Sequence, residues 1–335
     1  DGTTEIVVVY DTESALNVDV WSPELTCDES GWQTGGHSNE VAWSWSDADL
    51  RIGITSPHAP TRESNHLSVT QPLLADLELD GQPELVISAV DINSEDPQIM
   101  TIPLGSSTPT APSWEVILDR GTHPSDPAWA QLDDSNTAVV ATTIDENSGN
   151  MWIWRLDGAT GSNSWGRVAI TGTDFDDNSP RLRLPSPVVT QLDSDSAPEM
   201  ILTVPTDSNG GTTGYGARFV GMELTSTQEI FSFRSQNGFA DAPPLPIDTD
   251  ADGIDDRLCW VTWYSTSSFS FDREGMVGCH DLSNDPPTKE WSKVMNRGGS
   301  GNSNDEIAVS PPSLMDINGE DGDDIIVAFG RRVFA

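Results

Sequence analysis

The sequence predicts an all-β protein that folds as a β-propeller of four-stranded antiparallel blades, and three observations support this. Turn formers are frequent, with 28 Gly and 23 Pro spread along 335 residues. Between them lie short runs rich in β-branched and aromatic residues, such as ELVISAV at 84–90, which is the pattern of strands. An acid-rich loop followed by such a run recurs about every 60 residues, and a repeat of that length made only of strands is typical of a propeller blade.

The acid-rich loop is clearest in PIDTDADGIDD at 246–256. Counting from Asp248, acids occupy places one, three, five and nine, and glycine occupies place six. The 131–139 copy has lost most of its acids. We predict that each full repeat supplies one strand before the loop and three after it. The frame fits six segments of the chain: near 1–5, 76–84, 131–139, 191–199, 248–256 and 316–324.

The repeats cover the whole sequence, so we expect a single propeller domain over residues 1–335. The first repeat is longer than the others: we interpret 23–40 as an inserted loop, after which the runs at 40–46 and 50–55 give one extra strand. About five and a half blades fit into the chain, which indicates a ring of roughly six or seven. The array begins inside one acid-rich loop and ends one strand after another. We therefore expect the chain to be cut from a longer one, or the ring to close with material from elsewhere.

The charge balance excludes two classes of partner. Asp and Glu number 54 against 16 Lys and Arg, which gives a formal net charge of −38. Such a surface repels a nucleic-acid backbone and anionic lipid. Hydrophobic residues make up 36% of the chain, and 12 Trp and 9 Phe can build a core, so the chain is not predicted to be disordered. No apolar run is long enough to span a membrane, so we expect no direct membrane insertion.

The excess of acids also predicts how the protein responds to salt. A few divalent ions would offset only part of the charge, and Lys289 and Lys293 are the only lysines. We interpret the remaining acidity as halophilic adaptation, because dissolved salt screens the repulsion between like charges. Thermal unfolding in rising NaCl checks this hypothesis: the midpoint is expected to rise with salt. A midpoint that stays constant or falls would contradict it.

The loop pattern favours a bound calcium ion. Carboxylates clustered without Lys or Arg repel one another unless a cation lies among them, and oxygen ligands in flexible geometry suit Ca²⁺. The spacing is similar to the start of an EF-hand, which also needs an acid at place twelve and flanking helices. Place twelve is Ile87, Cys259 or Val327 here, each inside a predicted strand, so the EF-hand interpretation fails. Solvated turns remain the simpler alternative, because Asp, Asn and Gly are ordinary turn residues.

The loop and the strand after it resemble the calcium loops of FG-GAP/VCBS-type repeats, which are found in the propeller of integrin α-subunits. The resemblance covers nearly the whole chain, although the Phe-Gly box of the family is reduced to FG at 329–330. It implies Ca²⁺ in three loops, with the 191–199 loop as a fourth candidate and the 131–139 loop empty. The implied ligands are Asp76, Glu78, Asp80, Gln82 and Glu84; Asp193, Asp195 and Glu199; Asp248, Asp250, Asp252, Ile254 and Asp256; and Asp316, Asn318, Glu320, Gly322 and Asp324.

Two variations affect these implied sites. The 191–199 loop has Gln191 at place one instead of an acid, and the last loop has its glycine at place seven instead of six. Within the 248–256 loop, Asp255 falls at place eight and is not expected to be a ligand.

Cys259 and Cys279 flank a predicted hairpin, where they form either a disulfide or two buried thiols.

Two classes of function follow from this reading. The first is a secreted or cell-surface propeller that acts as a binding, adhesion or structural scaffold module for a protein or glycan ligand, or for copies of itself. The alternative is a secreted carbohydrate-active enzyme, such as a propeller polysaccharide lyase. No nucleophile elbow, phosphate loop or dinucleotide motif is present in the sequence, so we predict no catalytic residues and favour the first class.

Overall fold

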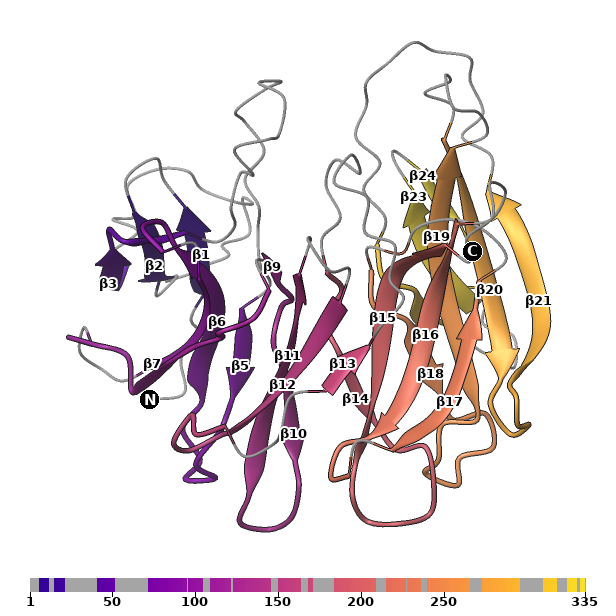
Figure 1. Ribbon diagram of the computed structural model, residues 1–335, viewed down its shortest axis with the longest axis horizontal. Helices are drawn as coiled ribbons and strands as arrows, with labels where there is room; N and C mark the ends of the chain where they lie inside the picture. The colour runs from indigo at the N-terminus through magenta and orange to yellow at the C-terminus, as the bar shows by residue number, and fades with distance from the viewer. Residues whose placement is uncertain are drawn as a thin grey trace, which may run out of the picture.

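Every regular element in the described part of the computed structural model is a β-strand. Antiparallel pairing joins these strands into six sheets, which follow one another in chain order from the indigo to the yellow end of the ribbon (Figure 1). The structure describes residues 6–11, 15–21, 41–51, 72–94, 96–104, 109–121, 123–145, 150–163, 168–170, 184–208, 215–226, 228–235, 240, 242–265, 273–295, 310–317, 324–329 and 332–334.

The first three sheets are each built on a pair of long neighbouring strands. The first sheet contains β1 (Ile6–Asp11), β2 (Leu16–Trp21) and β3 (Val41–Asp47). The second contains β6 (Glu84–Asp91), β7 (Pro97–Pro103) and β8 (Trp114–Ile117), with β4 (Leu50–Arg51) and β5 (Leu73–Ala75) both on the free edge of β6. The third repeats this plan with β11 (Thr137–Asp145), β12 (Asn150–Asp157), β13 (Val168–Ile170), β9 (His123–Pro124) and β10 (Ala128–Gln131).

The next two sheets are regular four-stranded meanders, and the last has three strands. The fourth sheet contains β14 (Val188–Thr190), β15 (Glu199–Ser208), β16 (Tyr215–Glu223) and β17 (Glu229–Arg234). The fifth contains β18 (Leu245–Ile247), β19 (Arg257–Ser265), β20 (Arg273–Asp281) and β21 (Thr288–Met295). The sixth contains β22 (Ser313–Met315), β23 (Asp324–Phe329) and β24 (Arg332–Phe334).

Five hydrophobic cores lie between the six sheets, one for each consecutive pair. β6 shows how a strand serves two of them. Its residues Leu85 and Ile87 pack into the core shared with the first sheet, whereas Val86 packs into the core shared with the third. Because side chains alternate across a strand, a central strand between two cores must be apolar at nearly every position. This face-to-face stacking of consecutive sheets is the β-propeller architecture that the repeat predicts.

The strand pattern read from the sequence is confirmed in the second to fifth sheets. There the run before each loop forms the first strand, the run after it forms the long second strand, and two further runs complete the sheet. The predicted run at 50–55 contains β4, which adds to the second sheet beside β5. Two details differ from the prediction: β9 adds to the third sheet beside β10, and β24 follows β23, so that two strands follow the last acid-rich loop. The 1–5 loop and the 23–40 insertion lie outside the described residues.

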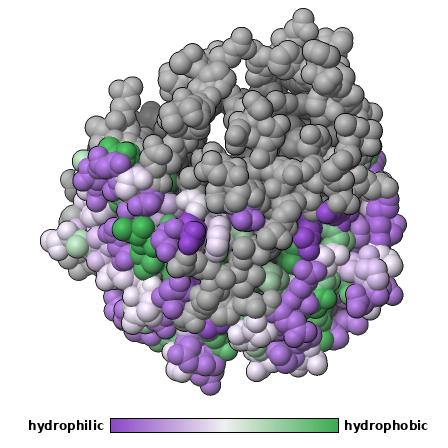
Figure 2. All heavy atoms as spheres, in the orientation of Figure 1, coloured by the Kyte–Doolittle hydropathy of each residue, from purple (hydrophilic) through white to green (hydrophobic). Residues whose placement is uncertain are grey.

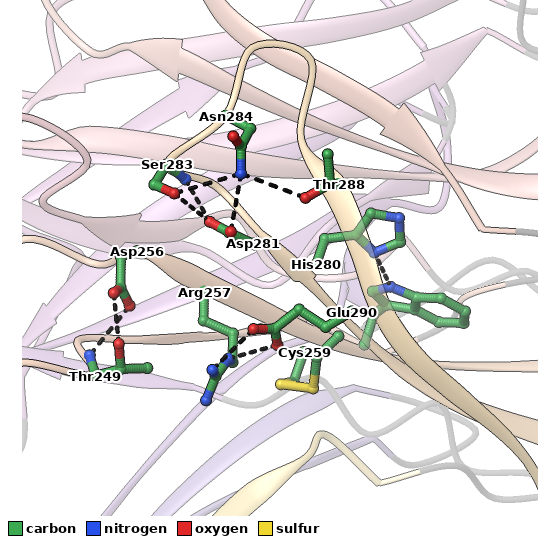
Figure 3. A network of polar contacts seen from close by, with 12 residues as sticks. Thr249, Asp256, Arg257, Cys259, His280, Asp281, Ser283, Asn284, Thr288 and Glu290 are labelled. Carbon is green, nitrogen blue, oxygen red and sulfur yellow. Dashed lines mark hydrogen bonds and ion pairs between the residues drawn. A yellow bond between two sulfur atoms is a disulfide. The ribbon is translucent and has the colours of Figure 1, made fainter.

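The central hairpin of the fifth sheet carries a disulfide between Cys259 and Cys279. The two cysteines lie directly opposite each other in the β19–β20 register, and both are fully buried. Of the two states that the sequence leaves open, the structure therefore shows the disulfide, drawn in yellow in Figure 3. A cross-link at this position fixes the pairing of two strands that contribute to the fourth and fifth cores.

An aromatic group next to the disulfide contains a buried histidine. The ring of His280 stacks on Phe233 of the preceding sheet at 3.9 Å between centroids. Its Nδ1 accepts a hydrogen bond of 3.0 Å from the indole Nε1 of Trp260, as drawn in Figure 3. Burial, assisted by the charge of Lys289, lowers the pKa of His280 from 6.5 to about 4. The imidazole is therefore neutral in the folded protein at physiological pH and serves as an acceptor in the core.

The face shown in Figure 2 is mixed in character, with hydrophilic side chains spread between smaller hydrophobic areas. Exposed apolar residues come from several sheets, among them Leu74, Ile117 and Val294. Singly exposed apolar side chains are normal on a folded surface. They therefore do not by themselves define a docking site.

Candidate metal centre

The 248–256 loop brings three carboxylates together. Ligand oxygens of Asp248, Asp250 and Asp252 all lie within 4.8 Å of one another. The backbone curls around the first of them: Asp248 accepts hydrogen bonds from the N–H groups of Ala251 at 2.7 Å and Gly253 at 2.8 Å. These donors, with that of Gly253 first, lower the pKa of Asp248, so this carboxylate keeps its negative charge. Places one, three and five therefore face one centre, as the spacing predicts.

Two of the loops share an unusual backbone conformation. Gly81 and Gly253, both at place six, have φ values of 88° and 92°. This is the left-handed conformation that glycine adopts without the steric cost of a Cβ atom. Leu79 and Ala251, both at place four, also have positive φ, at 56° and 62°. A left-handed non-glycine residue is disfavoured by about 1–2 kcal/mol, and its recurrence at one place indicates that the loop closure imposes this conformation.

The acid at place nine has the same local role in four loops. One of its oxygens accepts a hydrogen bond from the backbone N–H of place two, seven residues earlier. Figure 3 shows this contact between Asp256 and Thr249, together with the second bond that the Thr249 hydroxyl donates. The acid at place nine therefore connects the beginning of the loop to the start of the second strand. The acids concerned are Glu84 with Leu77, Glu199 with Leu192, Asp256 with Thr249, and Asp324 with Ile317.

The 76–84 loop repeats the fold of the 248–256 loop with looser carboxylates. Asp76 accepts hydrogen bonds from the N–H groups of Asp80 at 3.0 Å and Gly81 at 2.7 Å. Burial raises the pKa of Glu84, and the charges of Glu78, Asp76 and Asp80 act in the same direction. Among the described residues, groups of three close acidic ligands occur at two places, and this loop is not one of them. Its ligand set therefore stays a prediction.

The 191–199 loop departs from the pattern at its first place. Gln191 points its amide nitrogen at the backbone, where it donates to the carbonyls of Asp193 at 2.9 Å and Asp195 at 2.7 Å. Oxygens of Asp193 and Glu199 instead lie within 4.8 Å of a third acid, Glu223. Burial is the main cause that raises the pKa of Glu199 to about 7, and the neighbouring acids add to it. Sequence spacing could not indicate Glu223, because it comes from β16, opposite Glu199 in the register.

The two remaining loops are those at 316–324 and 131–139. The first is described only in part, and the second forms a different kind of turn. In the 316–324 loop Asp316 is exposed and Asp324 pairs with Ile317, whereas Asn318, Glu320 and Gly322 lie outside the described residues. In the 131–139 loop, Asp133 accepts hydrogen bonds from Ser135 and from the side chain of Asn136. This is an ordinary polar turn.

Asp255 joins two sheets. Its carboxylate accepts a hydrogen bond from the hydroxyl of Thr190, and its backbone N–H donates to the carbonyl of Gln191 at 2.8 Å. Thr190 is the last residue of β14 in the fourth sheet, and Gln191 is the first residue of the loop that follows it. The residue at place eight is therefore used in packing between neighbouring blades, consistent with its exclusion from the predicted ligands.

The residues at 248–256 fit a calcium ion. Ca²⁺ is bound by carboxylates and backbone carbonyls, and this loop supplies three convergent carboxylates. The nearest cation along the chain, Arg257, is engaged at 2.7 Å with Glu290 of β21 (Figure 3) and so does not neutralise the cluster. At place seven, the N–H groups of Gln82 and Ile254 donate to the acids at place five. The use of their carbonyls as ligands stays a prediction.

No protein-family model and no curated protein matches the chain. Among solved structures it is similar to the WD40 domain of SCAP from fission yeast, at 10% identity and a TM-score of 0.35 over 98% of this chain and 80% of that one. It is also similar to an endo-arabinase from Bacteroides thetaiotaomicron, at 10% identity and a TM-score of 0.32 over 89% and 94%. An endo-1,4-beta-xylanase from the same organism gives 11% and 0.34 over 87% and 94%.

Proposed function

We propose that the chain is a calcium-stabilised β-propeller module that acts outside the cell as a binding, adhesion or structural scaffold. The observation that carries this proposal is the convergence of Asp248, Asp250 and Asp252 on one centre. An ion there would join the two ends of the loop that connects β18 with β19. Its role is structural, because it would hold the hairpin between two strands of one blade.

One further feature of the structure supports a location outside the cell or at its surface. The disulfide between Cys259 and Cys279 is typical of oxidising compartments, and calcium is abundant outside cells. No helix in the described residues has the length and hydropathy needed to cross a membrane. The acidic surface favours partners that are neutral or basic, such as a protein or an uncharged glycan, or copies of the chain joined through cations.

A binding screen with a parallel assay for chemistry tests this function. The full chain with calcium is expected to bind a protein or glycan on an array, or to self-associate in sedimentation, and to leave polysaccharides chemically intact. EDTA is expected to weaken that binding because it loosens the hairpin loops. Incubation with uronate polysaccharides followed by detection of unsaturated product is the opposing arm. Calcium-dependent formation of such product would assign the chain to the carbohydrate-active enzymes instead.

A further inference from the structure

Three acids meet at one end of the fourth sheet, two from neighbouring strands and one from the loop before them. Glu199 begins β15, Glu223 ends β16, and the two residues lie opposite each other in the antiparallel register. Asp193 belongs to the loop between β14 and β15. One ligand oxygen from each acid lies within 4.8 Å of the others. Asp193 and Glu199 belong to the nine-place frame of the loop, whereas Glu223 lies outside it and is brought to them by strand pairing.

The buried carboxylate of Glu199 has one oxygen without a partner. The residue is fully buried; one oxygen accepts a hydrogen bond from the N–H of Leu192, and the other, Oε1, has no hydrogen-bond partner among the residues that the structure describes. The matching acid Asp256 is satisfied at both oxygens by Thr249. A buried carboxylate oxygen without a donor or cation is costly. The position of Glu199 among two further acids therefore points to a missing positive partner.

The acids near Glu199 are placed differently from those of the other loops, so they surround a different point from the centre of the 248–256 loop. Gln191 has no carboxylate to offer at place one, and its amide nitrogen is engaged with two carbonyls of the loop. The added acid lies on the opposite side, at Glu223. In the second sheet the residue opposite the equivalent acid Glu84 is Pro103, which has no ligand atom in its side chain. Compared with the 76–84 and 248–256 loops, the fourth sheet therefore lacks the acid at place one and has an additional acid, Glu223, on the adjoining strand.

We propose that Asp193, Glu199 and Glu223 bind a divalent cation of the oxygen-preferring class, Ca²⁺, at a centre between the loop and β16. Three carboxylates supply the negative charge, and the unpartnered oxygen of Glu199 becomes a ligand. Asp193 and Glu223 are only half-buried, so water can reach the centre and complete the coordination sphere. The cation links β14, β15 and β16, whereas an ion in the 248–256 loop would link only the two strands beside that loop.

Calorimetric titration of the EDTA-stripped full chain with CaCl₂ tests this centre. Glu223→Gln is expected to bind one ion fewer than the parent chain, or to bind the ion of this centre at least about tenfold more weakly. Loss of a residue that only supports a ligand already weakens metal binding by about tenfold or more, so loss of a ligand should do at least as much. Asp250→Ala is the matched control in a different loop, and it is expected to keep this ion. A Glu223→Gln chain with the parent's ion count and affinities would overturn the proposal. Circular dichroism verifies that each variant is folded.

Glu199→Gln gives a second, independent measurement. In mildly alkaline buffer with EDTA, this variant is expected to unfold at a higher temperature than the parent, because it removes an unpaired buried charge. It is also expected to lose the part of the calcium-dependent stabilisation that belongs to this centre. Unchanged calcium-dependent stabilisation would contradict the proposal. If Asp250→Ala titrates like the parent while Glu223→Gln still loses an ion, the proposed calcium loop at 248–256 fails and this centre stands.

Discussion

EDTA is expected to lower the thermal unfolding midpoint of the chain by several degrees, because bound calcium stabilises only the folded loops. One site saturated at a hundred times its dissociation constant adds about 2.7 kcal/mol to the free energy of unfolding, so two or three sites add roughly 5 to 8 kcal/mol. Differential scanning calorimetry with excess calcium and with EDTA measures this difference. An unfolding midpoint that EDTA leaves unchanged would show the calcium assignment to be wrong.

Asp250→Ala measures how much of the calcium-dependent stabilisation comes from the 248–256 loop. The Asp250 carboxylate is exposed, and its Oδ1 accepts only a long hydrogen bond of 3.3 Å from the N–H of Asp252, so its removal leaves the loop backbone supported by Asp248. We expect this variant to unfold like the parent in EDTA and to gain less from calcium, by about the 2 to 3 kcal/mol of one site.

Asp134→Ala is the matched control for this loop. Asp134 is also an exposed acid in a hairpin loop, but it belongs to the 131–139 copy, which the sequence predicts to be empty. This variant is expected to keep the full calcium increment of the parent. An equal loss of the increment in both variants would mean that the effect comes from general surface charge and not from a bound ion.

Second strands such as β6 and β15 could be predicted from the sequence because they are buried on both faces and are therefore mostly apolar. ELVISAV and EMILTV have this property, and both form the expected strands β6 and β15. β9 could not be predicted, because it has two residues and contains Pro124. Such a short strand is defined by the edge of the sheet that it joins, which periodicity does not encode.

The candidate site was predictable only where its ligands lie within one loop. Asp248, Asp250 and Asp252 are close in sequence and are brought together by the turn itself. Glu223 is 24 positions from Glu199, and their proximity depends on the length of the β15–β16 hairpin and its bulge. Place nine also has a role that spacing does not show, since its acid is held by the N–H of place two. Contacts across strands require the register, and one sequence does not fix it.

Acidification from pH 7 to pH 4.5 is expected to destabilise the fold by about 2 kcal/mol through His280 alone. The pKa of this residue is about 4 in the folded protein, against 6.5 ordinarily, so the unfolded chain takes up the proton first. Stability from the neutral imidazole is therefore fully present above pH 6.5 and is lost as the pH falls from 6.5 through 4. The core offers a protonated ring little compensation, because Phe233 covers it and Trp260 donates to its Nδ1.

Urea unfolding of the parent and of His280→Gln, at both pH values and in EDTA, measures this contribution. The glutamine oxygen can still accept from the indole of Trp260, but the side chain does not titrate. Carboxylates across the chain also titrate in this range, and EDTA removes the additional pH dependence of calcium binding. Their contribution is common to both proteins and cancels in the comparison. We expect the loss of stability on acidification to be about 2 kcal/mol smaller in the variant. An equal loss in both proteins would mean that the pKa of His280 is the same in the folded and the unfolded chain, and would contradict its burial as a neutral acceptor for Trp260.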